Sequence, residues 1–139
     1  MATQPRQSDH LAFLNLYAVN PDGTQKWVFT TSGYAAFSPA MGREGTLYLL
    51  SGDGSLYAVN PDGTEKWKVV IGGPDSTYYL STPSLGADGT IYVGSNNGSL
   101  YAVSPGGMVL WTYQTGDRIY SSPAVGRDGT IFFSSTDGN

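Results

Sequence analysis

The chain contains few of the side chains that usually carry out catalysis. It has a single histidine, His10, and no cysteine. A Ser-His-Asp triad needs a histidine placed beside its nucleophile, and a zinc site needs several histidines or cysteines at set spacings. His10 lies in an N-terminal segment that shares no pattern with the rest of the chain. These residue types therefore indicate neither a catalytic site nor a metal site, and we expect no cofactor.

Carboxylates recur at regular places, always beside glycine. They are Asp22, Glu44, Asp62, Asp88 and Asp128. Aspartate is common in tight turns because its carboxylate accepts backbone hydrogen bonds, so we interpret these residues as structural. The segment Ser51-Gly52-Asp53-Gly54 superficially resembles a calcium loop, but it lacks the alternating oxygen ligands and the closing glutamate.

Three tryptophans, Trp27, Trp67 and Trp111, end three similar segments. An aromatic face can stack on a sugar or a quinone, but a tryptophan at a fixed place in a repeated strand favours packing between neighbouring units. We therefore assign all three to structural packing.

The positions of these residues follow an internal repeat. Residues 16–27 recur almost unchanged as 56–67 and, with more substitutions, as 100–111, at intervals of 40 and 44 residues. A second block, 38–48, recurs as 82–92 and 122–132 at intervals of 44 and 40. A fixed period of this length is typical of repeat architectures.

Each period predicts four short strands. The segments are rich in β-branched and aromatic residues, and each is bounded by Gly, Asn or Asp. One set is expected at 35–41, 46–51, 55–60 and 66–71, and the next at 79–85, 90–95, 99–104 and 109–114. Four antiparallel strands per period form the blade of a β-propeller. A β-sandwich also has short strands at this spacing, but it need not repeat a twelve-residue motif. The sequence therefore predicts an all-β propeller.

The repeated residues resemble the pyrroloquinoline-quinone-type propeller repeat, which occurs in quinoprotein dehydrogenases and in an outer-membrane assembly lipoprotein. The pattern Ser-Pro-Ala-Val-Gly-x-Asp-Gly-Thr-Ile matches from Ser122 onward, and the pattern Leu-Tyr-Ala-Val-Asn-Pro-x-Gly matches from Leu16. The resemblance implies that Trp27, Trp67 and Trp111 wedge between blades, and that Gly45, Gly89 and Gly129 form the turn between the first two strands. It also suggests pyrroloquinoline quinone as a cofactor. The family's enzymes, however, use a longer chain, a catalytic Asp, a calcium site and usually a vicinal disulfide.

The strand order predicts a tail at residues 1–15 and repeats at 16–139. Within the repeats we expect a half-blade at 16–30, whole blades at 34–71 and 78–114, and a half-blade at 118–135. The two half-blades are complementary, and exposed sheet edges invite pairing with another chain. Two copies joined head to tail would close a six-bladed ring, which predicts a homodimer. A nine-bladed trimer, a fibre and a fragment of a larger propeller are alternatives.

Variation concentrates in the loops that join consecutive blades, and these loops share one face of a propeller. We predict a ligand site there, with tyrosines and charged residues around a channel mouth. Its candidate residues are Tyr34, Asp75, Tyr78, Asp117 and Arg118.

Composition excludes some classes of function. The net charge is −4 and the basic residues are scattered, which argues against a nucleic-acid partner. No apolar run is long enough for a membrane span or a signal peptide, and the compartment is undetermined. The leading hypothesis is a non-enzymatic scaffold for protein–protein interaction. A lectin-like binder of glycans or small ligands and a fragment of a quinone-dependent dehydrogenase are the alternatives.

Overall fold

The computed structural model describes residues 13–33, 38–72 and 81–138. All regular structure in these residues is β-strand, and every strand pair is antiparallel. The strands are β1 (Leu14–Val19), β2 (Gln25–Thr31), β3 (Ala40–Met41), β4 (Leu47–Leu50), β5 (Ser55–Val59), β6 (Glu65–Val70), β7 (Ser84–Leu85), β8 (Ile91–Gly94), β9 (Ser99–Val103), β10 (Val109–Gln114), β11 (Ala124–Val125) and β12 (Ile131–Phe132). The prediction of an all-β chain is confirmed.

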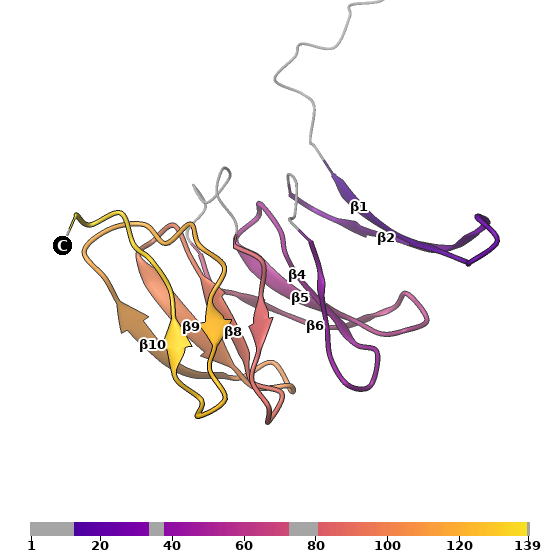
Figure 1. Cartoon of the computed structure of the whole chain (residues 1–139). Coiled ribbons are helices and arrows are strands. Elements are labelled where there is room, and N and C mark those ends of the chain that lie inside the picture. Colours follow the sequence, from indigo (N-terminus) through magenta and orange to yellow (C-terminus); the bar gives the residue numbers. More distant parts are fainter. Residues whose placement is uncertain (1–12, 34–37, 73–80, 139) are drawn as a thin grey trace, which may run out of the picture.

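The strands form four separate sheets. The first full sheet has the order β3-β4-β5-β6, and the second full sheet has the order β10-β9-β8-β7. The N-terminal hairpin, β1-β2, and the C-terminal hairpin, β11-β12, are two-stranded. In Figure 1 the N-terminal hairpin lies at one side of the molecule and the C-terminus at the other, with the first full sheet between the N-terminal hairpin and the second full sheet. The number of blades in a closed ring stays a prediction.

Several observed strand bounds differ from the predicted ones. The strand β1 begins at Leu14, before the predicted start of the repeats, because Leu14 and Asn15 pair with Thr31 and Thr30 of β2. Within the predicted strands 35–41 and 79–85, the described residues form strand at β3 and β7, two residues each, and residues 35–37 and 79–80 lie outside the described residues.

Tight turns explain why the third and fourth strands of each unit pair as hairpins. At Asn60-Pro61-Asp62-Gly63, the Gly63 N–H donates to the Asn60 carbonyl at 2.9 Å, and the Asn60 N–H donates to the Thr64 carbonyl at 2.8 Å. Gly63 has a φ of +88°, a conformation that glycine adopts without steric cost. The register shifts between Ala58 and Val59, as expected for a type I turn followed by a glycine bulge.

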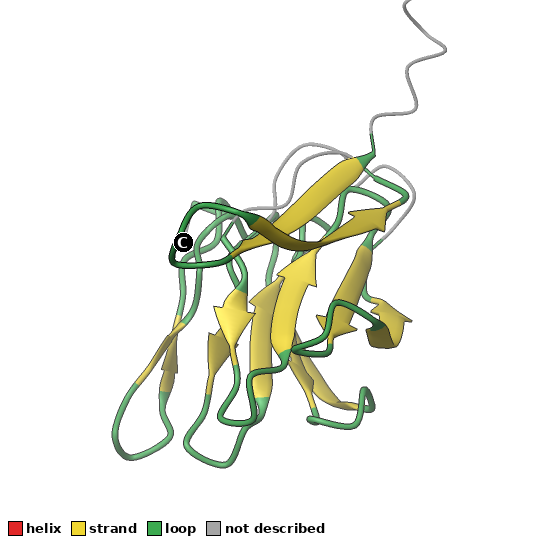
Figure 2. Ribbon diagram, turned by 90° about the vertical axis from the view of Figure 1, so that its right-hand side faces the viewer, coloured by secondary structure: helices red, strands yellow, loops and turns green. Residues whose placement is uncertain are grey.

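Two apolar clusters hold neighbouring sheets together. The larger one joins the two full sheets, and Leu50, Leu56, Ile91 and Val103 are among its buried members. The smaller one joins the first full sheet to the N-terminal hairpin through Leu49, Tyr57 and Val59, with Leu16 and Phe29 packed against them. In Figure 2 the N-terminal hairpin lies in front of the remaining sheets. The core therefore consists of layers between sheets, and each sheet needs a neighbour on both faces to bury its side chains.

Candidate functional site

Two of the five residues predicted to form a ligand site lie in the described part of the chain. They are Asp117 and Arg118, whereas Tyr34, Asp75 and Tyr78 lie outside the described residues. The Asp117 carbonyl accepts hydrogen bonds from the hydroxyls of Thr115 and Ser135, at 2.6 and 2.9 Å. The Arg118 N–H donates to the Asp117 carboxylate at 2.7 Å. These contacts order the loop after β10 against the C-terminal hairpin, and the ligand site itself stays a prediction.

Two of the three tryptophans connect one sheet to the next. Trp27 of β2 donates its indole N–H to the Pro61 carbonyl of the first full sheet at 3.0 Å. Trp67 of β6 donates in the same way to the Pro105 carbonyl of the second full sheet at 2.9 Å. Both indoles are half-buried. Each of these two tryptophans thus extends from its own sheet and donates a hydrogen bond to a turn of the next sheet along the chain.

Glycine is required where each indole meets that turn. A Cβ at Gly63 would lie 2.6 Å from the Trp27 ring, and a Cβ at Gly107 would lie 2.8 Å from the Trp67 ring. Both distances are shorter than carbon atoms can approach without displacement. The glycine therefore serves the turn and also leaves room for the tryptophan of the preceding sheet.

The third tryptophan, Trp111 of β10, is 41% exposed. Its ring packs against Tyr92 with centroids 5.9 Å apart, as the Trp67 ring packs against Tyr48 at 5.8 Å. The ring of Trp111 is therefore oriented like the half-buried ring of Trp67, although no following turn covers it within the described residues.

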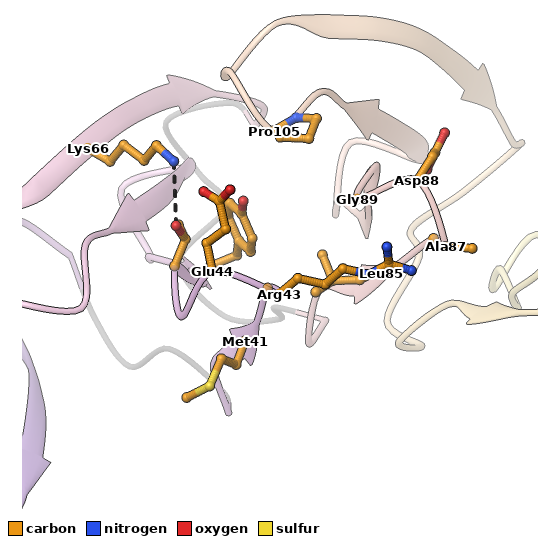
Figure 3. Close-up of a pocket in the computed structure, with 13 residues that line it drawn as sticks. Met41, Arg43, Glu44, Lys66, Leu85, Ala87, Asp88, Gly89 and Pro105 are labelled. Atoms are coloured by element: carbon orange, nitrogen blue, oxygen red, sulfur yellow. Dashed lines mark hydrogen bonds between the residues drawn. The ribbon is translucent and has the colours of Figure 1, made fainter.

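A cleft of about 420 Å³ lies between the two full sheets (Figure 3). It is lined by Met41, Gly42, Arg43, Glu44, Thr46, Tyr48, Lys66, Leu85, Gly86, Ala87, Asp88, Gly89 and Pro105. The Lys66 ammonium lies 3.5 Å from the Thr46 hydroxyl. The lining combines two basic and two acidic side chains with exposed apolar surface from Met41. Such a cleft suits a polypeptide side chain or a small zwitterionic group better than a strongly charged ligand.

The sequence did not predict this cleft. The predicted ligand site lay on the face of the variable loops, whereas the cleft is formed by the repeated turns at 42–46 and 86–90. The signal was the repeat itself, because turns copied in neighbouring sheets must lie side by side.

The aspartates of the repeated turns act as the sequence predicted. Each accepts hydrogen bonds from the threonine two residues later, and these bonds hold the pKa of the carboxyl below its ordinary value. For Asp22 and Asp62 the threonine hydroxyl is the main cause and the backbone N–H the second. For Asp88 and Asp128 the order is reversed. Their structural role is confirmed by these bonds.

Two buried tyrosines give the fold a pH dependence in alkali. Burial raises the pKa of the Tyr48 and Tyr57 phenols, and a hydrogen bond to Asp53 adds to the rise at Tyr57. The unfolded chain therefore loses these protons first, near pH 10. The free energy of unfolding should be unaffected by these groups below about pH 10 and should fall as the pH rises further through the raised pKa values.

Urea titrations between about pH 8 and 11 measure this decline. Tyr48→Phe removes one of the two phenols and should make the decline shallower. A wild-type profile that stays flat across this range would contradict the assignment.

Within residues 13–33, 38–72 and 81–138, no three His, Asp or Glu side chains form a group suited to a metal ion. In the same part of the chain, no helix has the length and apolar character needed to cross a membrane.

Comparison with known proteins identifies relatives of the repeat. The family model described as outer membrane protein assembly factor BamB matches residues 11–139. No curated protein matches. The crystal structure of BamB from Moraxella catarrhalis superposes with a TM-score of 0.74 at 20% identity, over 88% of this chain and 41% of that one. A protein of unknown function from Bacteroides caccae superposes with a TM-score of 0.59 at 15% identity, over 81% of this chain and 43% of that one. The chain thus spans less than half the length of either structure.

Proposed function

Because the chain belongs to the family of the outer membrane protein assembly factor BamB, we propose that it is a propeller module that acts as a scaffold for protein–protein interaction and assembly. The proposed module is not an enzyme and binds no cofactor. Its blades are completed by a second copy, and two copies joined head to tail close a six-bladed ring. The cleft between the two full sheets is the surface we propose for a partner's side chain.

The observation that carries this proposal is the contrast in burial between equivalent residues. Val59 in the first full sheet is 0% exposed, whereas the equivalent Val19 in β1 is 61% exposed. Tyr48 is 4% exposed, whereas the equivalent Phe132 in β12 is 61% exposed. Burying a large apolar side chain stabilises by about 1.5–3 kcal/mol. Pairing of the N-terminal hairpin with the C-terminal hairpin of a second copy would therefore bury these side chains and stabilise both hairpins.

The full sheets supply the register for this pairing. In the first full sheet Leu47 pairs with Val59 and Tyr48 with Ala58. The second full sheet repeats the register, with Ile91 opposite Val103 and Tyr92 opposite Ala102. The equivalent pairs in a composite blade are Ile131 with Val19 and Phe132 with Ala18, one residue of each pair from each copy.

One chain cannot make these pairs with itself. The strands β1 and β12 lie at opposite sides of the molecule, with the first full sheet between them (Figure 1). A second copy brings its β1 to β12 and its β12 to β1, and the two-fold relation makes both junctions identical. Strands from a longer chain could pair with the same sheet edges in place of a second copy. The mass of this chain in solution distinguishes the two, because only pairing with a second copy makes it a dimer.

Light scattering after size exclusion should give about twice the chain mass of 14.8 kDa. A monomer contradicts the ring, a mass of three chains contradicts six blades, and a broad distribution indicates an open fibre. Val19→Lys places a charge in the junction and should give monomers at a concentration where the wild type is a dimer. The matched control Val70→Lys changes an exposed valine of β6 that lies outside the junction, and should leave the dimer intact.

A further inference from the structure

We infer that the turn Asn20-Pro21-Asp22-Gly23 of one copy is the docking site for Trp111 of the second copy. This inference rests on the ring closure proposed above and adds the residues that determine which ends meet. It assigns an interaction surface whose partner is a second copy of this chain.

The turn that would receive Trp111 has the geometry of the two turns that hold a tryptophan. Gly23 has a φ of +89°, against +88° at Gly63 and +91° at Gly107. The Gly23 N–H donates to the Asn20 carbonyl at 2.9 Å, and the same bond occurs at Gly63 and Gly107 at 2.9 Å. A Cβ at Gly23, however, would meet nothing within 4 Å. The space over this glycine is open, whereas an indole occupies it at the other two.

The tryptophan that would fill this space is already oriented for it. Trp111 and Tyr92 pack with their planes 42° apart, close to the 38° between Trp67 and Tyr48. In the two filled contacts the indole N–H donates to the carbonyl of the turn's proline, Pro61 or Pro105. The equivalent acceptor for Trp111 is the carbonyl of Pro21 in the second copy. A preoriented ring also loses little entropy on docking.

A second contact converges on the same proline. A Cβ at Gly45 would lie 3.2 Å from the Pro61 ring, and a Cβ at Gly89 would lie 3.2 Å from the Pro105 ring. The equivalent Gly129 has nothing within 4 Å of its Cβ position. In the closed propeller, the pyrrolidine ring of Pro21 from the second copy would cover Gly129. The Pro21 carbonyl would accept a hydrogen bond from the Trp111 indole N–H. The second full sheet and the C-terminal hairpin of one copy would thus both contact the same turn of the second copy. These two contacts favour head-to-tail pairing over other arrangements of the two copies.

The variants Trp111→Ala and Gly23→Ala test the contact from its two sides. Trp111→Ala removes the indole, and Gly23→Ala adds a methyl group where the indole must lie. Each should weaken the dimer by about 30-fold or more, as expected for a tryptophan at the centre of an interface. Dissociation constants come from light scattering over a dilution series, with folding verified by circular dichroism.

Mixing the two variants isolates the contact itself. A mixed dimer has one native Trp111–Gly23 junction and one junction in which the added methyl group meets alanine. Native mass spectrometry separates the three dimers by mass. If the residues touch across copies, the mixed species should exceed the half of all dimers expected by chance, because the two substitutions are coupled. The strain of alanine at the positive φ of this position does not contribute, since each Gly23→Ala chain carries it equally as a monomer and in either dimer.

Two results would overturn the inference, and they are distinguishable. If the wild type is a dimer but the mixed species forms only in the random proportion, Trp111 and Gly23 do not meet and the ring closes otherwise. If the wild type is a monomer, the proposed ring and this contact both fail.

Discussion

Leu56→Ala is expected to lower the free energy of unfolding by about 2–5 kcal/mol. Leu56 lies in β5, a central strand of the first full sheet, and is fully buried. It belongs to the cluster that joins the two full sheets, with Tyr48, Ile91 and Val103. Truncation would leave a cavity between the two sheets. Because each sheet is made rigid by its hydrogen-bonded strands, the sheets can close this cavity only in part.

Urea unfolding followed by circular dichroism measures the loss, and an unchanged dependence on urea concentration would show that only stability has changed. Val70→Ala is the control, because Val70 is exposed on β6 of the same sheet and its truncation should change stability by no more than about 0.5 kcal/mol. A loss below about 1 kcal/mol for Leu56→Ala would contradict a core formed between sheets.

Much of the fold could be predicted because the repeat encodes it locally. The motif of 16–27 contains a strand, a turn with its required glycine, and the start of the next strand. Its three copies therefore predicted β1, β5 and β9 to within a few residues. The resemblance to the pyrroloquinoline-quinone-type repeat, stated from these residues, is confirmed by the family match over residues 11–139 and by the BamB superposition.

The cleft could not be predicted in the same way, because no single period contains it. Arg43 and Glu44 come from one turn, Asp88 from the equivalent turn of the next sheet, and Pro105 from the turn after that. Only the packing of sheet on sheet brings them together. The predicted site at Tyr34, Asp75, Tyr78, Asp117 and Arg118 relied instead on variation between loops. Variation shows where the repeat is relaxed, but it does not determine which side chains face one another.

Because the chain repeats itself, the environments of equivalent residues can be compared within one molecule. Trp27 and Trp67 establish how the repeated tryptophan docks, whereas Trp111 is 41% exposed. Comparison between the three repeats is therefore the basis for the interaction surface proposed at Trp111.

In the proposed ring, β12 of one copy pairs with β1 of another in the register of the full sheets. The chain contains no cysteine, so introduced cysteines report only on each other. Ile131→Cys and Val19→Cys chains, mixed and mildly oxidised, should form a disulfide-linked species of twice the chain mass, since directly opposed residues have Cβ atoms close enough for the bond. Phe132→Cys with Val19→Cys is the control, because a shift of one residue places the two side chains on opposite faces of the sheet. We expect efficient cross-linking of the first pair and little of the second. Equal cross-linking of both pairs, or none of the first, would contradict this pairing.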